Sequence, residues 1–316
     1  MQDRYAGDIG DFGKFALLKE LKRQKLSVGV NWYKTDPPKS EKNSDGSFKQ
    51  NHGKYKCIPC EIREYDKGLA GKLSQISEND ETRCIEALEA AHLLIGNAYY
   101  HNTISVDKRS EWHSDALSFF KVKNVDLVFL DPDNGLLVDS VKEYYPRSVK
   151  YVFYSEVMDY LSHGQSVLIY NHRSRKAEWK YFQDIEARIR KEAVEYCPKL
   201  ASELTISAIT FPRYSIRDYI AISAKQEHIE KIQKAFSSLL DSKYADPEIR
   251  FCYKSLTSDI TFSEYQRRLN SKAGFQKSFQ ALPKEVAMRM IDRENAGTTV
   301  KVCMASVWTS KESNTM

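Results

Sequence analysis

Acidic side chains that directly follow an apolar segment are the feature of this sequence that most strongly suggests chemistry. Val125–Leu130 has the composition of a buried β-strand, and Asp131, Pro132, Asp133 and Asn134 come immediately after it. A buried strand would hold the first carboxylate rigidly, and the proline would fix the turn that follows. An ordinary turn is the alternative, because Asp-Pro and Asn-Gly pairs are common in turns. A turn alone does not require two acids beside a hydrophobic strand, so we expect the functional centre here.

Polar residues also follow the other strands that the sequence predicts. In an open α/β sheet, ligands bind outside the carboxyl ends of the strands, where the strand order switches. Side chains that come directly after strands therefore belong to one candidate rim. The rim residues are Asp36, Asp107, Arg109, Asp131, Asp133, Asn134, Asn171, His172 and Arg173. Their grouping predicts a ligand site at this edge of the sheet.

Periodicity predicts the elements that position these residues. Besides Val125–Leu130, the strands expected are Val28–Tyr33, Asn102–Val106, Gly164–Tyr170, Ala201–Phe211 and Asp218–Ala224. The helices expected are one from an N-cap at Asp11 to about Gln24, most of 67–99, and then Ser114–Phe120, Val138–Tyr144, Val149–Leu161, Ala177–Lys191 and Glu227–Leu240. Strands separated by helices predict an α/β fold with a mostly parallel sheet, to which the last two strands add an antiparallel edge hairpin.

The pattern changes near the C-terminus and suggests two parts. We expect an α/β domain over residues 1–250 and a helical C-terminal extension over 251–316. Helices are expected at Phe262–Leu269 and Lys284–Glu294. Basic residues in this extension would be able to contact phosphates.

Composition limits the class of protein. The net charge of +5 and the pI near 8.7 permit phosphate binding without requiring it. No segment has the run of apolar residues that a membrane helix needs, and the N-terminus lacks a secretory apolar region. Six cysteines in 316 residues are too few for a disulfide scaffold. We therefore expect a cytoplasmic protein with no membrane partner; the sequence identifies no protein partner.

Two short motifs carry a resemblance to a known family. The segment from Ala6 to Phe15 reads A-G-D-I-G-D-F-G-K-F, and Asp131-Pro132 ends a later strand. In both spacing and order these resemble the bacterial 23S rRNA adenine-N6 methyltransferases of the J type, which have A-G-N-x-x-D-x-x-K-H before a helix and D-P-P-Y after a strand. Two departures stand out. Asp36-Pro37-Pro38 replaces the family's glycine-rich cofactor loop, and Asp133-Asn134 replaces its second proline and tyrosine.

The resemblance implies a Rossmann-like, methyltransferase-type sheet, S-adenosylmethionine as cofactor and nucleic acid as substrate. It implies that Asp131 holds the target amine with help from Asn134. Asp133 and His172, at the ends of the same strands, are further candidates for catalytic residues. The residues assigned by the resemblance to the cofactor side are Asp8, Asp11, Lys14, Asn31, Asp36, Asp107 and Arg109.

Two other functions remain open. Asp131 and Asp133 are oxygen ligands two residues apart, and with Asp107 or Glu156 they could hold Mg²⁺ in a metal-dependent nuclease or phosphodiesterase. In that case His172 could act on a phosphate. Alternatively, the chain is a non-catalytic binding or sensor module that kept the fold while its cofactor loop decayed.

Overall fold

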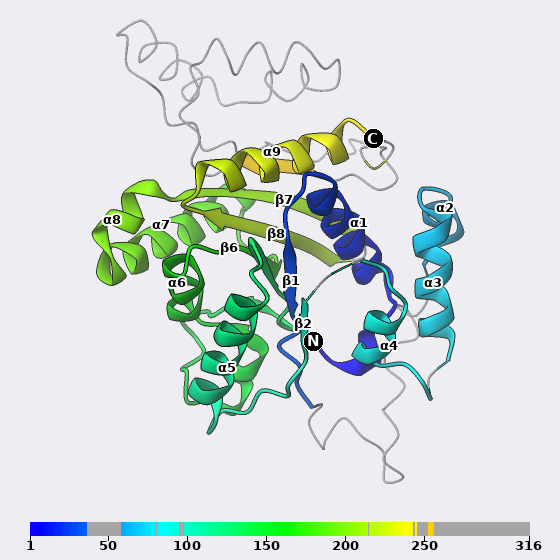
Figure 1. Ribbon diagram of the computed structural model, residues 1–316, viewed down its shortest axis with the longest axis horizontal. Helices are drawn as coiled ribbons and strands as arrows, with labels where there is room; N and C mark the ends of the chain where they lie inside the picture. The colour runs from blue at the N-terminus through cyan, green and yellow to red at the C-terminus, as the bar shows by residue number, and fades with distance from the viewer. Residues whose placement is uncertain are drawn as a thin grey trace, which may run out of the picture.

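A computed structural model describes residues 1–36, 58–79, 81–94, 96, 98–213, 215–242, 244 and 252–255. Over these residues the chain forms a three-layer α/β fold, with helices on both faces of a sheet (Figure 1). The helices are α1 (Ile9–Arg23), α2 (Cys60–Arg63), α3 (Lys67–Glu78), α4 (Ile85–Ala90), α5 (Arg109–Val122), α6 (Tyr154–Ser162), α7 (Glu178–Tyr196), α8 (Pro198–Glu203) and α9 (Gln226–Leu240), with 3₁₀ helices at Asp3–Tyr5 and Pro146–Lys150.

The described strands form one large sheet and one small one. The large sheet contains β1 (Val28–Asn31), β2 (Ala98–Tyr100), β3 (Leu127–Leu130), β6 (Ser166–His172), β7 (Thr205–Arg213), β8 (Ser215–Ser223) and β9 (Cys252–Ser255), in the order β2-β1-β3-β6-β8-β7-β9. The small sheet pairs β4 (Gly135–Leu136) with β5 (Tyr151–Val152).

Strand directions agree with the predicted α/β class. β1 lies parallel to β2 and β3, and β3 lies parallel to β6. β8 is antiparallel to both β6 and β7, and β9 is antiparallel to β7. The sheet is therefore mixed and mostly parallel, and the predicted β7–β8 hairpin is present with β9 outside it. This arrangement is compatible with a Rossmann-like fold.

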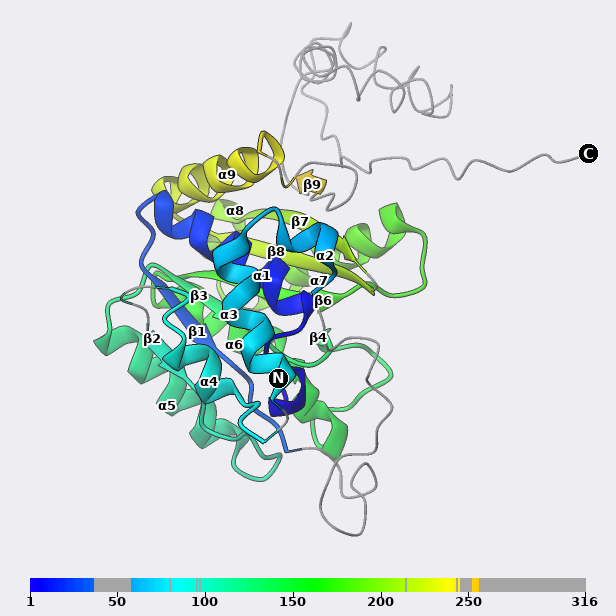
Figure 2. The same cartoon turned by 90° about the vertical axis from the view of Figure 1, so that its right-hand side faces the viewer.

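Side-chain alternation in the strands builds two cores. Successive residues of a strand point to opposite faces of the sheet. In β3, Leu127 and Phe129 pack into the core beneath α1, α3 and α9, whereas Val128 and Leu130 pack into the core beneath α5, α6 and α7. Figure 2 shows α1 and α3 in front of the sheet. Because both faces are covered, β3 is an uninterrupted apolar run, which explains its clear signal in the sequence.

Several predicted elements are wrong or shifted. The strand expected at Asn102–Val106 is absent, because the main-chain partners of β1 are Ala98–Tyr100. No helix forms over Val138–Tyr144, where a turn closes through a hydrogen bond from the Val141 amide to the Val138 carbonyl.

The boundaries of three further elements also differ. The strand expected from Ala201 begins only at Thr205, because α8 continues to Glu203. Asn171 and His172 belong to β6 rather than following it. The N-cap of α1 is Asp8, not Asp11, because the Asp8 carboxylate accepts the hydrogen bond from the Asp11 amide.

The expected C-terminal helices lie outside the described residues, and the proposed boundary at residue 250 stays a prediction. β9 lies just beyond it and pairs with β7. No helix within the described ranges is both long enough and apolar enough to cross a membrane.

Candidate functional site

The first turn of α1 supplies one wall of the site. Gly7 has a φ of +79°, a conformation that glycine adopts without strain, and its amide donates to Asp11 Oδ2 at 2.7 Å. Asp8 caps the helix by accepting from the Asp11 amide at 3.0 Å. Burial and the neighbouring Asp11 charge raise the pKa of Asp8 to about 6, although Arg217 opposes the shift. The glycines and acids of the A-G-D-x-x-D motif thus form a compact, buried turn.

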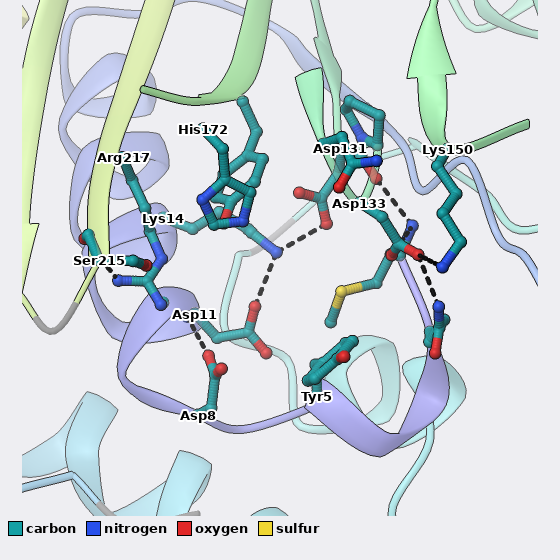
Figure 3. A pocket seen from close by; sticks show the side chains of 16 residues that line it. Tyr5, Asp8, Asp11, Lys14, Asp131, Asp133, Lys150, His172, Ser215 and Arg217 are labelled. Carbon is teal, nitrogen blue, oxygen red and sulfur yellow. Dashed lines mark hydrogen bonds and ion pairs between the residues drawn. The ribbon is translucent and has the colours of Figure 1, made fainter. Parts of the chain in front are cut away.

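A buried ion triad joins this turn to the end of β3. Lys14 Nζ lies 2.7 Å from Asp11 Oδ1 and 2.6 Å from Asp131 Oδ2, and all three side chains are at most 3% exposed. Burial lowers the pKa of Lys14, but the two carboxylates outweigh that effect and raise it above its ordinary value. Burial raises the pKa of Asp131, against the opposing charge of Lys14. Lys14 is therefore a fixed cation held between two carboxylates (Figure 3).

Asp133 has a separate set of partners. Its carboxylate accepts from Gln2 Nε2 at 2.6 Å and lies 3.2 Å from the Met1 ammonium and 3.8 Å from Lys150 Nζ. Burial would raise the pKa of Asp133, but these two cations lower it below its ordinary value. The carboxylate is therefore ionised and already paired.

These groups line a pocket of about 300 Å³ at the carboxyl edge of the sheet. Its lining contains carboxylates, cationic groups and hydroxyls (Figure 3). Its lining residues are Met1, Gln2, Tyr5, Asp8, Gly10, Asp11, Lys14, Asp131, Pro132, Asp133, Asn134, Lys150, Tyr170, His172, Ser215 and Arg217.

Two residues at the end of β6 also line the pocket. Tyr170 and His172 are joined by a 3.0 Å hydrogen bond between the hydroxyl and Nε2. His172 is exposed at its outer side, but partial burial of the ring and the nearby Arg217 charge lower its pKa to about 4. The imidazole is therefore neutral at pH 7.

The strand-end loop is positioned by a close backbone approach. The Asn134 amide donates to the Lys150 carbonyl at 3.0 Å, and the Asn134 carbonyl accepts from the His172 amide at 3.1 Å. Gly135 has a φ of +116°, and a Cβ at this position would lie 1.8 Å from Asn171 Oδ1. Glycine is thus required at the end of this loop.

The structure brings together seven of the eleven residues that the sequence assigned to the site. Asp8, Asp11, Lys14, Asp131, Asp133, Asn134 and His172 all line the pocket.

The other four residues, assigned to cofactor binding, do not line the pocket. Asp36 and Asp107 are exposed. Asn31 is buried and donates to the Tyr160 hydroxyl at 3.2 Å. Arg109 makes a bidentate ion pair with Glu156, at 2.7 and 2.8 Å. These structural contacts account for the burial of Asn31 and Arg109.

The pocket residues that sequence reasoning missed come mainly from the N-terminus and the hairpin. They are Met1, Gln2, Tyr5, Gly10, Pro132, Lys150, Tyr170, Ser215 and Arg217. The sequence does indicate Arg217, because an arginine in the otherwise apolar strand β8 is expected either to pair with an acid or to serve a binding site.

The acids do not gather as metal ligands gather. Within the described ranges, no group of three or more His, Cys, Asp and Glu side chains is arranged to hold a metal ion. The position between Asp11 and Asp131 is occupied by the Lys14 ammonium. The Mg²⁺ hypothesis therefore gains no specific contact.

In comparisons with known proteins, no family model matches the chain, and no curated protein or solved structure is significantly similar to it.

Proposed function

We propose that this protein is a methyltransferase-type enzyme that uses S-adenosylmethionine to methylate an amine of a nucleic-acid base. One observation carries the proposal. The two short motifs behind the resemblance lie 117 residues apart in sequence and are joined by the 2.6 Å ion pair between Lys14 and Asp131. Chance similarity of two peptides would not require them to share one buried contact.

The mixed, mostly parallel sheet supports the same proposal. Asp131 follows β3, which lies between β1 and β6 in the parallel part of the sheet. Ligands of open α/β sheets bind at this edge. The antiparallel β7–β8 hairpin completes the sheet type that the resemblance implies.

The chemistry of the lining fits one end of the proposed cofactor. S-adenosylmethionine carries a sulfonium, an ammonium and a carboxylate, and the pocket offers both carboxylates and cations. Its volume of about 300 Å³ lies at the lower end of the range for ligand sites, so it suits part of such a molecule. Asp8 and Asp131 would face the positive groups. When bound, the cofactor supplies the methyl group.

Asp131 has the geometry to orient an amine nucleophile. Lys14 holds Oδ2, whereas Oδ1 has no hydrogen-bond donor among the described residues. The free oxygen can accept a hydrogen bond from an exocyclic amine and direct the nitrogen lone pair toward the methyl donor. Pro132 lines the pocket and has no N–H of its own that would compete for that oxygen.

A methyl-transfer assay tests this proposal. Radiolabelled S-adenosylmethionine is incubated with the full chain and pooled RNA or DNA, in EDTA and in Mg²⁺. We expect transfer in both buffers and a loss of roughly 100-fold or more in Asp131→Asn. Asp126→Asn is the matched control. Asp126 comes directly before β3, at the end of the strand away from Asp131, and it does not line the pocket.

The proposal fails if calorimetry detects no binding of S-adenosylmethionine and no label enters nucleic acid. Cleavage of the nucleic acid in Mg²⁺ alone, lost in both Asp131→Asn and Asp133→Asn, would instead support the phosphodiesterase hypothesis.

A further inference from the structure

Two arginines with largely enclosed side chains, Arg109 and Arg173, share one mode of pairing. Arg109 uses Nε and Nη2 to bind both oxygens of Glu156, at 2.7 and 2.8 Å. Arg173 uses the same two nitrogens to bind both oxygens of Asp218, at 3.0 and 2.5 Å. In this fold, a buried guanidinium therefore presents its Nε–Nη2 edge to a carboxylate, the geometry that bidentate recognition requires.

Arg217 has no carboxylate bound at the same edge. Only 5% of the residue is exposed, and Nη1 donates to the carbonyls of Arg213 at 2.6 Å and Ser215 at 3.2 Å. Nε is buried with no hydrogen-bond partner, and no ion pair joins the guanidinium to any described residue. The Tyr170 hydroxyl, which bonds to His172, also lies within hydrogen-bonding reach of the guanidinium. The hairpin carbonyls thus hold the guanidinium in place while its paired donors face the pocket.

Gly10 lets the α1 backbone lie close to this edge of Arg217 and to Asp8. A Cβ at that position would lie 2.9 Å from Arg217 Nε and 2.9 Å from Asp8 Oδ1, so any other residue would displace one of them. Gly10 lies in the first turn of the 15-residue helix α1, whose N-terminal end is positive. A cation and an acid therefore face the same small space from opposite sides without touching each other (Figure 3).

We propose that Arg217 binds the carboxylate of an amino-acid group through Nε and Nη2, with Asp8 facing the ammonium of that group. A nucleic-acid phosphate suits the position less well, because a polyanion would meet the carboxylates of Asp8, Asp11, Asp131 and Asp133 in the same pocket. A zwitterion matches both signs of charge. That the group is the methionine end of S-adenosylmethionine rests on the proposed function; the carboxylate site itself does not.

The test compares adenosyl ligands with and without the amino-acid group, and the free amino acid. The full chain is titrated calorimetrically with S-adenosylhomocysteine, with 5′-methylthioadenosine, which lacks that group, and with L-methionine. We expect Arg217→Met to weaken S-adenosylhomocysteine binding by roughly tenfold or more and to leave 5′-methylthioadenosine binding unchanged. Arg217→Lys, which keeps the charge but loses the paired donors, should show an intermediate loss.

Two controls separate this role from a structural one. Arg190→Met removes an arginine that pairs with Glu186 on α7 outside the pocket, and it should bind every ligand like wild type. The ligand-free Arg217→Met protein is melted beside wild type, because the substitution also removes the Nη1 hydrogen bonds to the carbonyls of Arg213 and Ser215. Large destabilisation with unchanged ligand selectivity would make Arg217 a structural residue and overturn the inference.

The outcomes also separate this inference from the proposed function. If wild type binds S-adenosylhomocysteine and Arg217→Met binds it equally well, the inference is overturned and the proposed function stands. If wild type binds no adenosyl ligand but binds L-methionine or another free amino acid through Arg217, the inference stands and the proposed function fails. The carboxylate site is overturned if no amino-acid ligand binds, or if inorganic phosphate is the one ligand whose binding depends on Arg217.

Discussion

Individual side chains in the pocket show how burial sets their charge. Asp8 is 8% exposed and lies beside Asp11, so its ionised form loses solvation and meets a like charge. His172 is kept neutral by partial burial and the Arg217 charge. Lys14 keeps its proton because two carboxylates surround it. The pocket therefore holds charged and neutral polar groups in close contact at neutral pH.

The Asp8 shift makes a prediction for stability against pH. Its pKa of about 6 in the folded state exceeds the ordinary 3.8, so folding is favoured while Asp8 is protonated. That contribution is complete below pH 3.8 and is lost as the pH rises through 6. We expect Asp8→Asn, which can still cap α1, to be more stable than wild type at pH 7.5 by up to about 3 kcal/mol.

Urea denaturation at a series of pH values measures this difference. The advantage of Asp8→Asn should shrink between pH 6 and pH 4. An advantage of equal size at pH 4.5 and pH 7.5 would show that Asp8 titrates at its ordinary pKa in the folded protein.

At the scale of elements, the strand-end loop depends on one glycine. Gly135 begins β4 with a φ of +116°, and Asn171 Oδ1 occupies the place of a Cβ while accepting from the Leu136 amide at 2.6 Å. A side chain would therefore strain the backbone and displace Asn171 from β6. Because β6 also carries Tyr170 and His172, the change would reach the pocket wall.

We predict that Gly135→Ala lowers the free energy of unfolding by about 3 kcal/mol or more. Gly71→Ala is the matched control. Gly71 is exposed within α3 and has no atom within 4 Å of its added Cβ, so that substitution should stabilise the protein by about 0.5–1 kcal/mol. Chemical denaturation of both variants checks the prediction, and equal effects of the two substitutions would contradict it.

Over the whole molecule, β9 links residues 252–255 to the sheet. It pairs with β7 over four residues, from Ser207↔Ser255 to Thr210↔Cys252. The β7–β8 hairpin carries Arg217 and Ser215 into the pocket, so the strand on its outer side supports the same element. A chain cut after residue 250 would expose the edge of β7.

We therefore expect a chain ending at residue 250 to be less stable than one ending at residue 257 by about 2 kcal/mol. Thermal melting of the two truncated chains beside the full chain measures the difference. Equal melting temperatures would mean that 1–250 folds as a complete domain, as the sequence analysis expects.

The sequence by itself determined the elements with strong and continuous patterns. Val125–Leu130 was identified as a strand because both its faces are buried, and α9 was identified because it keeps a helical period for four turns. Residues of the two motifs, from Asp8 to Lys14 and from Asp131 to Asn134, were identified as site residues because their types and spacing are local properties. Short strands such as β2 were misplaced, because three residues carry too little pattern to fix a register.

Tertiary structure alone decided which polar residues share a pocket. Asp36 and Asp107 follow strands or precede helices as the site residues do, yet they lie outside the pocket. Arg109 and Arg217 are both buried arginines, but only the first has a carboxylate at its Nε–Nη2 edge. Such distinctions depend on contacts between segments far apart in the chain, like Lys14 with Asp131, and local sequence patterns do not record them.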